Sequence, residues 1–356
     1  YAKDGGSPPN IATVTVSIRI KDENDNRPMF EKDVYELQVP ENQERVSIFT
    51  AKATDKDAGE NGRVEYEIIG GDSSGHFWID KKTGILSTNS GLDRESISFY
   101  TLTIVARDQG IPQHSSSVSV SVTVLDVNDN SPTFMDSSYS IDIPENSAAS
   151  TVVLEVSATD GDEGSNGEVL YYLSSDAQGM FHIDEMGKIS TVMSLDREKQ
   201  TSYTFLVRAV DSAPSDPRSS TTRVEVNVKD VNDNSPLFIT DPLIVNISKL
   251  TPVNQIVATM KAEDKDFGAN ASIFYRFSAV ISGFSINSFT GEIRLLASLS
   301  SMTQSERTLF VVATDQGSPS RSSTGVVIIY LREEQYRGLR FRRSTSQIPL
   351  PENSAP

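Results

Sequence analysis

The segment Asp22-Glu-Asn-Asp-Asn26 decides the architecture, because it recurs as Asp126-Val-Asn-Asp-Asn130 and as Asp230-Val-Asn-Asp-Asn234. Each copy is followed by X-Pro-X-Phe, which places Phe30, Phe134 and Phe238 at a constant spacing of 104 residues. Self-similarity at a fixed spacing is the signature of tandem structural repeats.

Four other short motifs return in step with this segment. Pro-Glu-Asn begins at Pro40 and Pro144, and Leu-Asp-Arg-Glu begins at Leu92 and Leu195. Asp-X-Asp begins at Asp55, Asp160 and Asp264, and Ala-X-Asp begins at Ala106, Ala209 and Ala313. The spacing predicts complete repeats at 27–130, 131–234 and 235–334. It also predicts the C-terminal end of a preceding repeat at 1–26 and the start of a following repeat at 335–356.

Within a repeat the apolar pattern favours strands. The stretches 13–20, 117–124 and 222–228 alternate apolar and polar residues, as half-buried strands do. Repeats of this length with several short strands predict an all-β fold of tandem seven-stranded sandwiches, and because Cys is absent the fold has no disulfides. Trp78 lies between Phe77 and Ile79 in an expected strand, so we expect it to pack in the core rather than to serve as a platform for sugars.

Composition excludes several classes of function. The chain has 49 Asp and Glu against 32 Lys and Arg, and its net charge of −17 argues against nucleic-acid binding, which needs a basic face. Without Cys there is no thiolate metal site or cysteine nucleophile, and three His do not make a His-rich metal cluster. The longest apolar run, 325–331, falls short of the roughly 20 residues that a membrane span needs.

The excess acidity is concentrated in the repeated motifs. They hold 21 of the 49 acidic residues, and the remaining 28 nearly balance the basic ones. Bringing such carboxylates together costs free energy unless cations enter. Oxygen-only ligands favour Ca²⁺, with Mg²⁺ as the second choice because it demands stricter geometry. An EF-hand is excluded by spacing, because position six counted from Asp55 is Glu60 and position twelve is Tyr66.

The five motifs in this order resemble the calcium motifs of extracellular cadherin repeats, and the resemblance covers essentially the whole chain. It implies Greek-key, immunoglobulin-like sandwiches with up to about three Ca²⁺ ions at each complete junction between repeats. The long array is more similar to protocadherins and Fat/Dachsous-type cadherins than to cadherins with an N-terminal adhesive segment. The implied function is calcium-dependent cell–cell adhesion, at the extracellular face of the plasma membrane, by a membrane-anchored parent chain. The implied partner is another cadherin ectodomain, bound homophilically or heterophilically, with no nucleic acid and no small-molecule substrate.

The resemblance also implies the ligands, which fall into three junctions. At the N-terminal junction they are Asp22, Asn24, Asp25 and Asn26 with Asp55, Asp57, Asn61 and Asp108. At the first full junction they are Glu41, Asp93, Glu95, Asp126, Asn128, Asp129 and Asn130 with Asp160, Asp162, Asn166 and Asp211. At the second full junction they are Glu145, Asp196, Glu198, Asp230, Asn232, Asp233 and Asn234 with Asp264, Asp266, Asn270 and Asp315.

The last junction, which follows the third repeat, departs from the pattern. Ser248-Lys-Leu250 replaces Pro-Glu-Asn, Leu299-Ser-Ser-Met302 replaces Leu-Asp-Arg-Glu, and Glu333-Glu-Gln-Tyr-Arg337 replaces the linker motif. Three elements are lost together, so we expect this junction, near 333–341, to bind little or no Ca²⁺ and to be flexible or bent.

The acidic motifs also admit interpretations other than a cadherin. Asp93 with Glu95 and Asp55 with Asp57 could be the acid and base of a glycosidase. However, such pairs recur in successive repeats, whereas an active site is usually single, so we do not expect an enzyme. A calcium-binding sandwich array of a bacterial-type adhesin or carbohydrate-binding protein is the alternative. Asn246-Ile-Ser and Asn270-Ala-Ser are glycosylation sequons if the chain is secreted.

Overall fold

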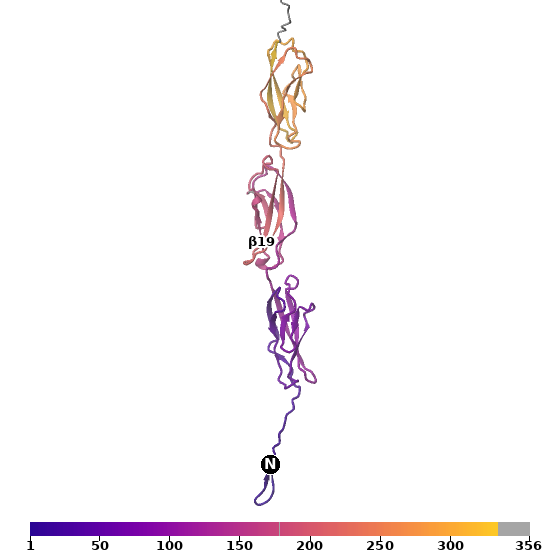
Figure 1. Cartoon of the computed structure of the whole chain (residues 1–356), viewed down its shortest axis with the longest axis vertical. Coiled ribbons are helices and arrows are strands. Elements are labelled where there is room, and N and C mark those ends of the chain that lie inside the picture. The colour runs from indigo at the N-terminus through magenta and orange to yellow at the C-terminus, as the bar shows by residue number, and fades with distance from the viewer. Residues whose placement is uncertain (178, 334–356) are drawn as a thin grey trace, which may run out of the picture.

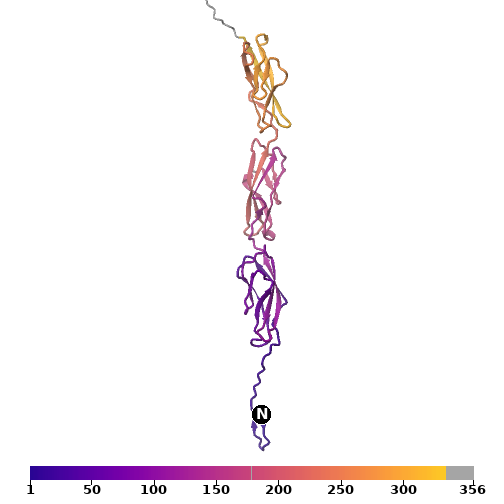
Figure 2. The same ribbon diagram turned by 90° about the vertical axis from the view of Figure 1, so that its right-hand side faces the viewer.

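The chain forms a rod of β-sandwiches stacked end to end. The computed structural model describes residues 1–177 and 179–333, and within them three sandwiches follow one another along the long axis (Figures 1 and 2). The N-terminal residues extend from one end of the rod as a thin arm that begins with a small hairpin (Figure 1). The places where two sandwiches meet are therefore narrow, and each is crossed by a single linker.

The strands of each sandwich have matching bounds. The N-terminal hairpin pairs β1 (Ala2–Lys3) with β2 (Ile11–Ala12). The first sandwich contains β3 (Met29–Phe30), β4 (Val34–Pro40), β5 (Ser47–Thr50), β6 (Ala53–Thr54), β7 (Glu65–Gly70), β8 (Phe77–Ile79), β9 (Ile85–Thr88), β10 (Phe99–Arg107) and β11 (Ser115–Leu125).

The second sandwich contains β12 (Thr133–Phe134), β13 (Ser138–Pro144), β14 (Val152–Glu155), β15 (Ala158–Thr159), β16 (Val169–Leu173), β17 (Phe181–Ile183), β18 (Lys188–Thr191), β19 (Ser202–Asp211) and β20 (Ser219–Lys229). It also contains the 3-10 turns η1 (Gly164–Asn166) and η2 (Ser175–Ala177). The third sandwich contains β21 (Leu237–Phe238), β22 (Leu243–Ser248), β23 (Ile256–Thr259), β24 (Ala262–Glu263), β25 (Phe274–Phe277), β26 (Phe284–Ile286), β27 (Glu292–Leu295), β28 (Glu306–Thr314) and β29 (Ser322–Arg332).

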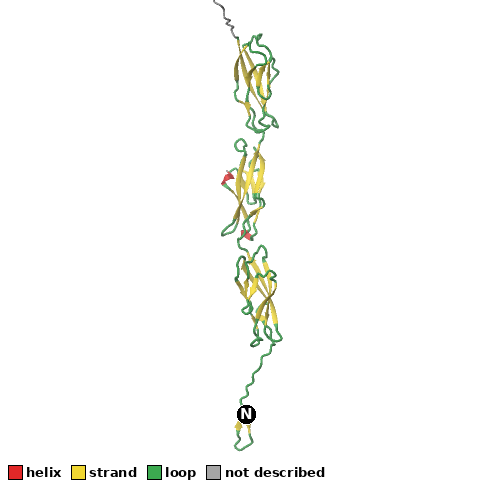
Figure 3. Ribbon diagram, turned by 45° about the vertical axis from the view of Figure 1, so that its right-hand side comes forward, coloured by secondary structure: helices red, strands yellow, loops and turns green. Residues whose placement is uncertain are grey.

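One topology serves all three sandwiches. In the first, a four-stranded sheet in the order β4-β11-β10-β7 faces a three-stranded sheet in the order β5-β9-β8, and β3 pairs with β6. Strand β4 runs parallel to β11, whereas the other pairings are antiparallel. The other two sandwiches repeat these orders strand for strand (Figure 3). The expected all-β sandwich fold is confirmed.

Strand alternation builds each core. Along β11 the inward residues Val118, Val120, Val122 and Val124 are buried, while the serines and threonine between them face outward. Each of these valines packs with side chains of the facing sheet, such as Leu86 on β9. Separate clusters of this kind fill the second and third sandwiches. Each sandwich thus has its own core, and the junctions must be held by something other than apolar burial.

The N-terminal arm differs from its expected structure. The alternating stretch 13–20 was predicted as a half-buried strand, but it lies outside the assigned strands. Its apolar side chains are exposed, with Val14 at 77% and Ile20 at 92% of full accessibility. The described chain offers this stretch no neighbouring sheet, and an alternating sequence cannot make a strand ladder alone.

Trp78 also differs from its expected position. The prediction that it packs in the core is wrong, because its side chain is 55% exposed while Phe77 and Ile79 on either side are buried. Successive residues of a strand point to opposite faces, so a residue between two inward neighbours must point outward.

In the part of the chain that the structure describes, no helix has the length and apolar character to cross a membrane.

The alternation at β8 makes a testable contrast between neighbours. We expect Phe77→Ala to destabilise the first sandwich by about 3–5 kcal/mol, because it removes a buried aromatic ring and leaves a cavity. Trp78→Ala should cost much less, since about half of that side chain already faces water. Urea unfolding in saturating Ca²⁺ measures both variants. Equal losses for the two variants would contradict the outward placement of Trp78.

Candidate metal centre

Each linker motif is bonded to the sandwich that follows it. At the first full junction, Asp126 Oδ1 accepts a hydrogen bond from the backbone N–H of Glu163 at 2.9 Å, and its Oδ2 accepts one from Asn166 Nδ2 at 2.8 Å. The equivalent Asp22 accepts bonds from Ala58 and Asn61, and Asp230 accepts bonds from Phe267 and Asn270. The first carboxylate of the linker therefore reaches across the joint in all three cases.

The last Asn of each linker holds the Asp-X-Asp loop. Asn130 donates from its backbone N–H to Asp162 Oδ2 at 3.1 Å and from its side-chain Nδ2 to Asp162 Oδ1 at 2.7 Å. Asn26 bonds Asp57 in the same way, and Asn234 bonds Asp266. These side-chain amides therefore act as hydrogen-bond donors within the junction.

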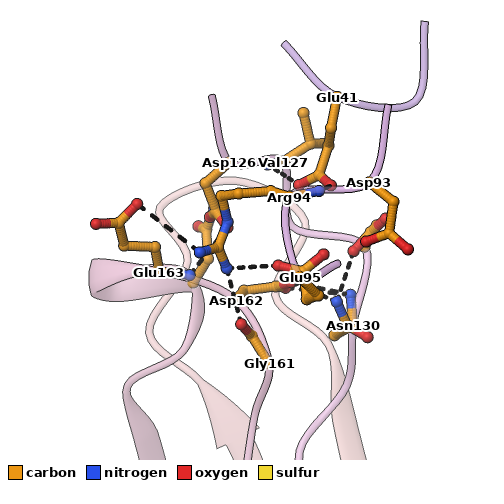
Figure 4. Close-up of polar contacts among 12 residues, drawn as sticks. Glu41, Asp93, Arg94, Glu95, Asp126, Val127, Asn130, Gly161, Asp162 and Glu163 are labelled. Carbon is orange, nitrogen blue, oxygen red and sulfur yellow. Dashed lines mark hydrogen bonds and ion pairs between the residues drawn. The ribbon is translucent and has the colours of Figure 1, made fainter. Parts of the chain in front are cut away.

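The upstream sandwich contributes a fixed glutamate. Glu41 is buried, and its two carboxylate oxygens accept bonds from the backbone N–H groups of Val127 at 2.9 Å and Arg94 at 2.8 Å (Figure 4). Glu145 is held in the same manner by Val231 and Arg197. The two backbone donors fix the direction of each buried carboxylate.

An arginine lies among the carboxylates at each full junction. Arg94 donates to Asp126 Oδ1 at 2.6 Å and to the carbonyl oxygen of Gly161, in the next sandwich, at 2.7 Å (Figure 4). At the second full junction, Arg197 pairs with Asp230 Oδ1 at 3.6 Å and also stacks over the ring of Phe267, with its guanidinium carbon 4.5 Å from the ring centroid. Both arginines thus bridge two sandwiches, one through polar contacts and the other through a cation–π contact.

Six buried oxygens at equivalent positions test whether the residues fit a metal ion. The Oδ2 atoms of Asp55, Asp160 and Asp264 are buried and have no hydrogen-bond partner among the described residues. The Oδ1 atoms of the central linker residues Asn24, Asn128 and Asn232 share this condition. A buried polar atom without a partner is costly. The same two positions carry one at all three junctions, so these oxygens fit a hard cation, for which carboxylate and carbonyl oxygens are the preferred ligands.

The carboxylates gather into groups small enough to share an ion. One oxygen each from Glu41, Glu95 and Asp129 lies within 4.8 Å of the others, and so does one each from Glu95, Asp126 and Asp162. The second full junction has the groups Glu145–Asp196–Glu198 and Glu198–Asp233–Asp266. In both junctions one glutamate, Glu95 or Glu198, belongs to two groups and stands at the centre of the cluster.

Without a cation, the ionised form of several of these carboxylates is unfavourable. Burial and the charge of Glu145 raise the pKa of Glu198 to about 7, with further contributions from Asp233 and Asp266. Burial, followed by the charge of Glu41, also raises the pKa of Glu95. At Asp160 burial is again the first cause of a raised pKa, together with the charges of Asp162 and Asp211. Ionised carboxylates are thus disfavoured where the predicted ligands converge.

The remaining predicted ligands lie at the same joints. Asp108, Asp211 and Asp315 are buried and accept backbone N–H bonds from the loops that follow them. Asp25, Asp129 and Asp233 accept bonds from the adjacent linker Asn. Asp93 is exposed and bonds Ser96 with both oxygens, so it lies outside the carboxylate groups of its junction. At the N-terminal junction the described residues supply candidate metal ligands from the linker and from the loops of the first sandwich. They supply no counterparts of Glu41, Asp93 and Glu95 there.

Sequence reasoning missed the residues that orient the linkers. His114 Nδ1 donates to the carbonyl of Asn26 at 2.8 Å, Arg218 donates to that of Asp129, and Arg321 donates to that of Asn232. These three residues follow the Ala-X-Asp aspartate by six or seven positions, a regular spacing that was available in the sequence. Phe267 was missed for another reason, because its partner Arg197 lies in a different repeat.

The last junction keeps the backbone and changes the side chains. The backbone N–H of Lys249 bonds the carbonyl of Arg332 at 3.0 Å, as that of Glu41 bonds Leu125 and that of Glu145 bonds Lys229. Lys249 therefore stands in the place of the buried glutamate. Its ammonium pairs with Glu333 Oε1 at 2.9 Å, and Glu333 follows β29 as Asp126 follows β11. The rest of the expected linker replacement, 334–337, and the expected next repeat at 335–356 lie outside the described residues.

Comparison with known proteins agrees with this geometry. The sequence profile of the cadherin domain matches residues 35–125, 139–229 and 244–332. Protocadherin-16 of Rattus norvegicus is 44% identical over 362 residues, covering 100% of this chain and 11% of that protein. Protein dachsous of Drosophila melanogaster is 40% identical over 349 residues, covering 96% of this chain and 10% of that protein. The chain thus spans about a tenth of the length of these relatives.

A solved structure matches the fold over most of the chain. The crystal structure of mouse cadherin-23 EC22-24 superposes with a TM-score of 0.78 at 30% sequence identity, covering 87% of this chain and 100% of that one. The similarity spans consecutive domains and not only a single sandwich.

The raised pKa of Glu198 predicts how metal-free protein responds to pH. Its pKa is near 4.5 when unfolded and about 7 when folded, so its favourable contribution is present below about pH 4.5 and is lost as pH rises through about 7. After removal of metal with a chelating resin, the melting temperature should fall between about pH 5 and pH 8. Glu198→Gln should flatten this dependence.

Glu185→Gln is the matched control, because Glu185 is an exposed glutamate elsewhere in the same sandwich. Differential scanning calorimetry at several pH values makes the comparison. If the melting temperature of Glu198→Gln changes with pH as much as that of the control, the raised pKa of Glu198 does not influence the stability of the metal-free protein.

Proposed function

This chain belongs to the cadherin family, and on that premise we propose that it acts in calcium-dependent cell–cell adhesion as a stretch of rod whose joints are stiffened by Ca²⁺. The coarser part of this proposal, membership in a family of adhesion proteins, rests on the domain profile and on relatives such as protocadherin-16 and dachsous. The finer part, Ca²⁺ at the joints, rests on the residues of this chain.

The unpartnered buried oxygens carry the calcium proposal. Asp55, Asp160 and Asp264 each bury one carboxylate oxygen without a partner among the described residues, two residues before the aspartate that the last linker Asn holds. Repulsion alone would drive such groups toward water. Their burial in three equivalent places is what a recurring cation site requires.

The chain's own residues explain how joints could be stiffened. Bound Ca²⁺ supplies positive charge and accepts oxygen ligands from both repeats at once. The linker carboxylate Asp126 is already bonded to the downstream loop, and Glu41 is already fixed in the upstream sandwich. The fold thus already orders some of the ligands, which lowers the entropic cost of ordering them when Ca²⁺ binds. Extracellular calcium modules bind at about 10⁻⁴–10⁻³ M, which suits a site that fills outside the cell.

We propose the repeat boundaries and the ligand sets that the sequence predicts. The repeats would run over 27–130, 131–234 and 235–334, between the end of one repeat at 1–26 and the start of another at 335–356. Each full junction would hold up to about three Ca²⁺ ions on its eight carboxylates. The parent protein would be anchored in the plasma membrane, with these repeats outside the cell and another cadherin ectodomain, identical or different, as partner.

Loss of the Asp160 charge tests the calcium sites. Asp160→Asn keeps the Oδ1 acceptor for the N–H of Asp162 and replaces the unpartnered oxygen by an amide nitrogen. We expect at least about a tenfold loss of Ca²⁺ affinity at the first full junction, or about 1.4 kcal/mol. Titration calorimetry measures it, and melting in Ca²⁺, in Mg²⁺ and without metal shows whether Ca²⁺ specifically raises the melting temperature.

Asp142→Asn is the matched control, because Asp142 is an exposed aspartate of the same sandwich that pairs with Lys229 on the outer face. A surface pair of this kind contributes little, so the control should bind Ca²⁺ as the natural chain does. Superimposable melts of the natural chain with and without Ca²⁺ would require the calcium mechanism to be withdrawn, although the fold would stand.

The last junction should behave differently from the two full ones. We propose that it holds little or no Ca²⁺, because the ammonium of Lys249 occupies the place of a ligand and already pairs with Glu333. Small-angle scattering of a protein that includes the complete following repeat should show a bend or hinge there, insensitive to Ca²⁺. A straight rod whose length across that joint depends on Ca²⁺ would refute this proposal.

A further inference from the structure

The outer face of the large sheet in the third sandwich is unusually apolar. Ile244 on β22 is 54% exposed, Phe310 on β28 is 48% exposed, and Tyr330 on β29 is 39% exposed. Val326 and Ile328 on β29 lie between them on the same face and are partly exposed. We call these five residues the apolar face. They are contiguous because Ile244 pairs with Ile328, and Val326 pairs with Phe310.

The other two sandwiches show that this face is not a requirement of the fold. In the first sandwich the pair equivalent to Ile244 and Ile328 is Glu36 and Ser121, and in the second it is Ser140 and Glu225. The same backbone therefore accepts polar residues there. An exposed apolar patch on a domain whose relatives lack it generally marks a surface that something covers.

A glycosylation sequon lies on this face. Asn246 of Asn246-Ile-Ser248 is exposed, and its cross-strand partner is Tyr330. Adjacent strands lie about 4.8 Å apart, so a group attached to Asn246 begins beside the tyrosine ring. The side-chain Oδ1 accepts a bond from Arg332 Nε at 3.1 Å. That bond does not use Nδ2, the atom that a glycan would occupy.

The other sequon has the opposite environment. Asn270 Nδ2 donates to Asp230 Oδ2 at 2.7 Å within the second full junction, and Asn270 is only partly exposed. A glycan attached there would enter the joint between two sandwiches. The folded structure therefore accommodates sugar at Asn246 and not at Asn270.

We infer that Asn246 carries an N-linked glycan whose first N-acetylglucosamine units lie over Tyr330, Ile244 and Ile328 and shield the apolar face from water. The donor class is a lipid-linked diphosphate oligosaccharide of the secretory pathway, consistent with the extracellular repeats of the family. Asn246 Nδ2 forms a bond to the anomeric carbon of the first sugar and loses one proton, while the bond from that carbon to the diphosphate breaks and the diphosphate leaves. The amide keeps one N–H. Sugar rings present C–H faces that can pack on an aromatic ring while their hydroxyl groups face water.

The position of the acceptor favours the glycan over a protein as the occupant. Asn246 belongs to the face itself, in the same cross-strand row as Tyr330, so a glycan rooted there would obstruct any protein that docked on these strands. Because the glycan would be covalently attached to Asn246, it would stay close to the apolar face and would need no separate binding free energy to reach it.

Site occupancy is tested first. The chain is secreted from mammalian cells, treated with peptide N-glycosidase in heavy-oxygen water, and mapped by mass spectrometry. We expect heavy-oxygen aspartate at position 246 and unlabelled Asn at position 270. An unmodified Asn246, or a fully occupied Asn270, would overturn the assignment whatever the calcium response of the same protein.

Shielding is tested with Asn246→Gln and with the double variant Asn246→Gln, Ile328→Ser. Both remove the sequon, and the second also restores the polar residue that the first sandwich has as Ser121. In saturating Ca²⁺ we expect Asn246→Gln to bind several times more hydrophobic dye than the glycosylated chain and to self-associate in sedimentation. The double variant should return to the glycosylated level.

Two results would overturn the shielding role. One is an Asn246→Gln protein that matches the glycosylated chain in dye binding and sedimentation. The other is self-association of the glycosylated chain that Ile328→Ser abolishes, because a second copy would then be the occupant. If Asn246→Gln is not secreted, enzymatic removal of the glycan from the folded natural chain replaces it, with the same expected changes.

Discussion

The crowding of carboxylates between independently folded sandwiches is the constraint on which the rest of this structure depends. Each sandwich has its own apolar core, so core packing does not join neighbours. What lies between them is a set of acids such as Glu95 and Glu198, each shared by two groups of carboxylates. Like charges in a partly buried place favour separation. Under the calcium proposal, the same groups would loosen a joint without a cation and close it with one.

The fold separates the scaffold of a junction from its chemistry. The backbone bond at Glu41 is repeated at Glu145 and at Lys249, although the last of these carries the opposite charge. Leu92, Leu195 and Leu299 are likewise all buried, although the acids that follow the first two are missing after the third. Strand ends and core leucines thus place the loops. The side chain at this loop position can then differ, as Glu41 and Lys249 do, while the backbone bond is kept.

The third sandwich departs from its neighbours in two places that lie close together. Its strand β22 carries the outward residues Ile244 and Asn246, and it ends next to Lys249, where the acidic pattern stops. A repeat in the middle of an array contacts only its neighbours, so its outer faces are free to change. The two departures lie on β22 and at its end, and they distinguish this repeat from the two before it.

The repeat, the all-β fold and the acidic motifs could be predicted from the sequence, because spacing and strand alternation are local properties. It also predicted that the last junction differs, since three motifs are lost there together. The contacts across a joint could not be predicted in this way, because Arg197 and Phe267, or Asn26 and His114, are far apart in the chain and meet only in the folded protein. Only the structure showed that Trp78 points outward and that 13–20 has no neighbouring strand within residues 1–177 and 179–333. Alternation places Trp78 on the face opposite to its neighbours, but which face is buried, and whether a pairing partner is present, depends on the whole sheet.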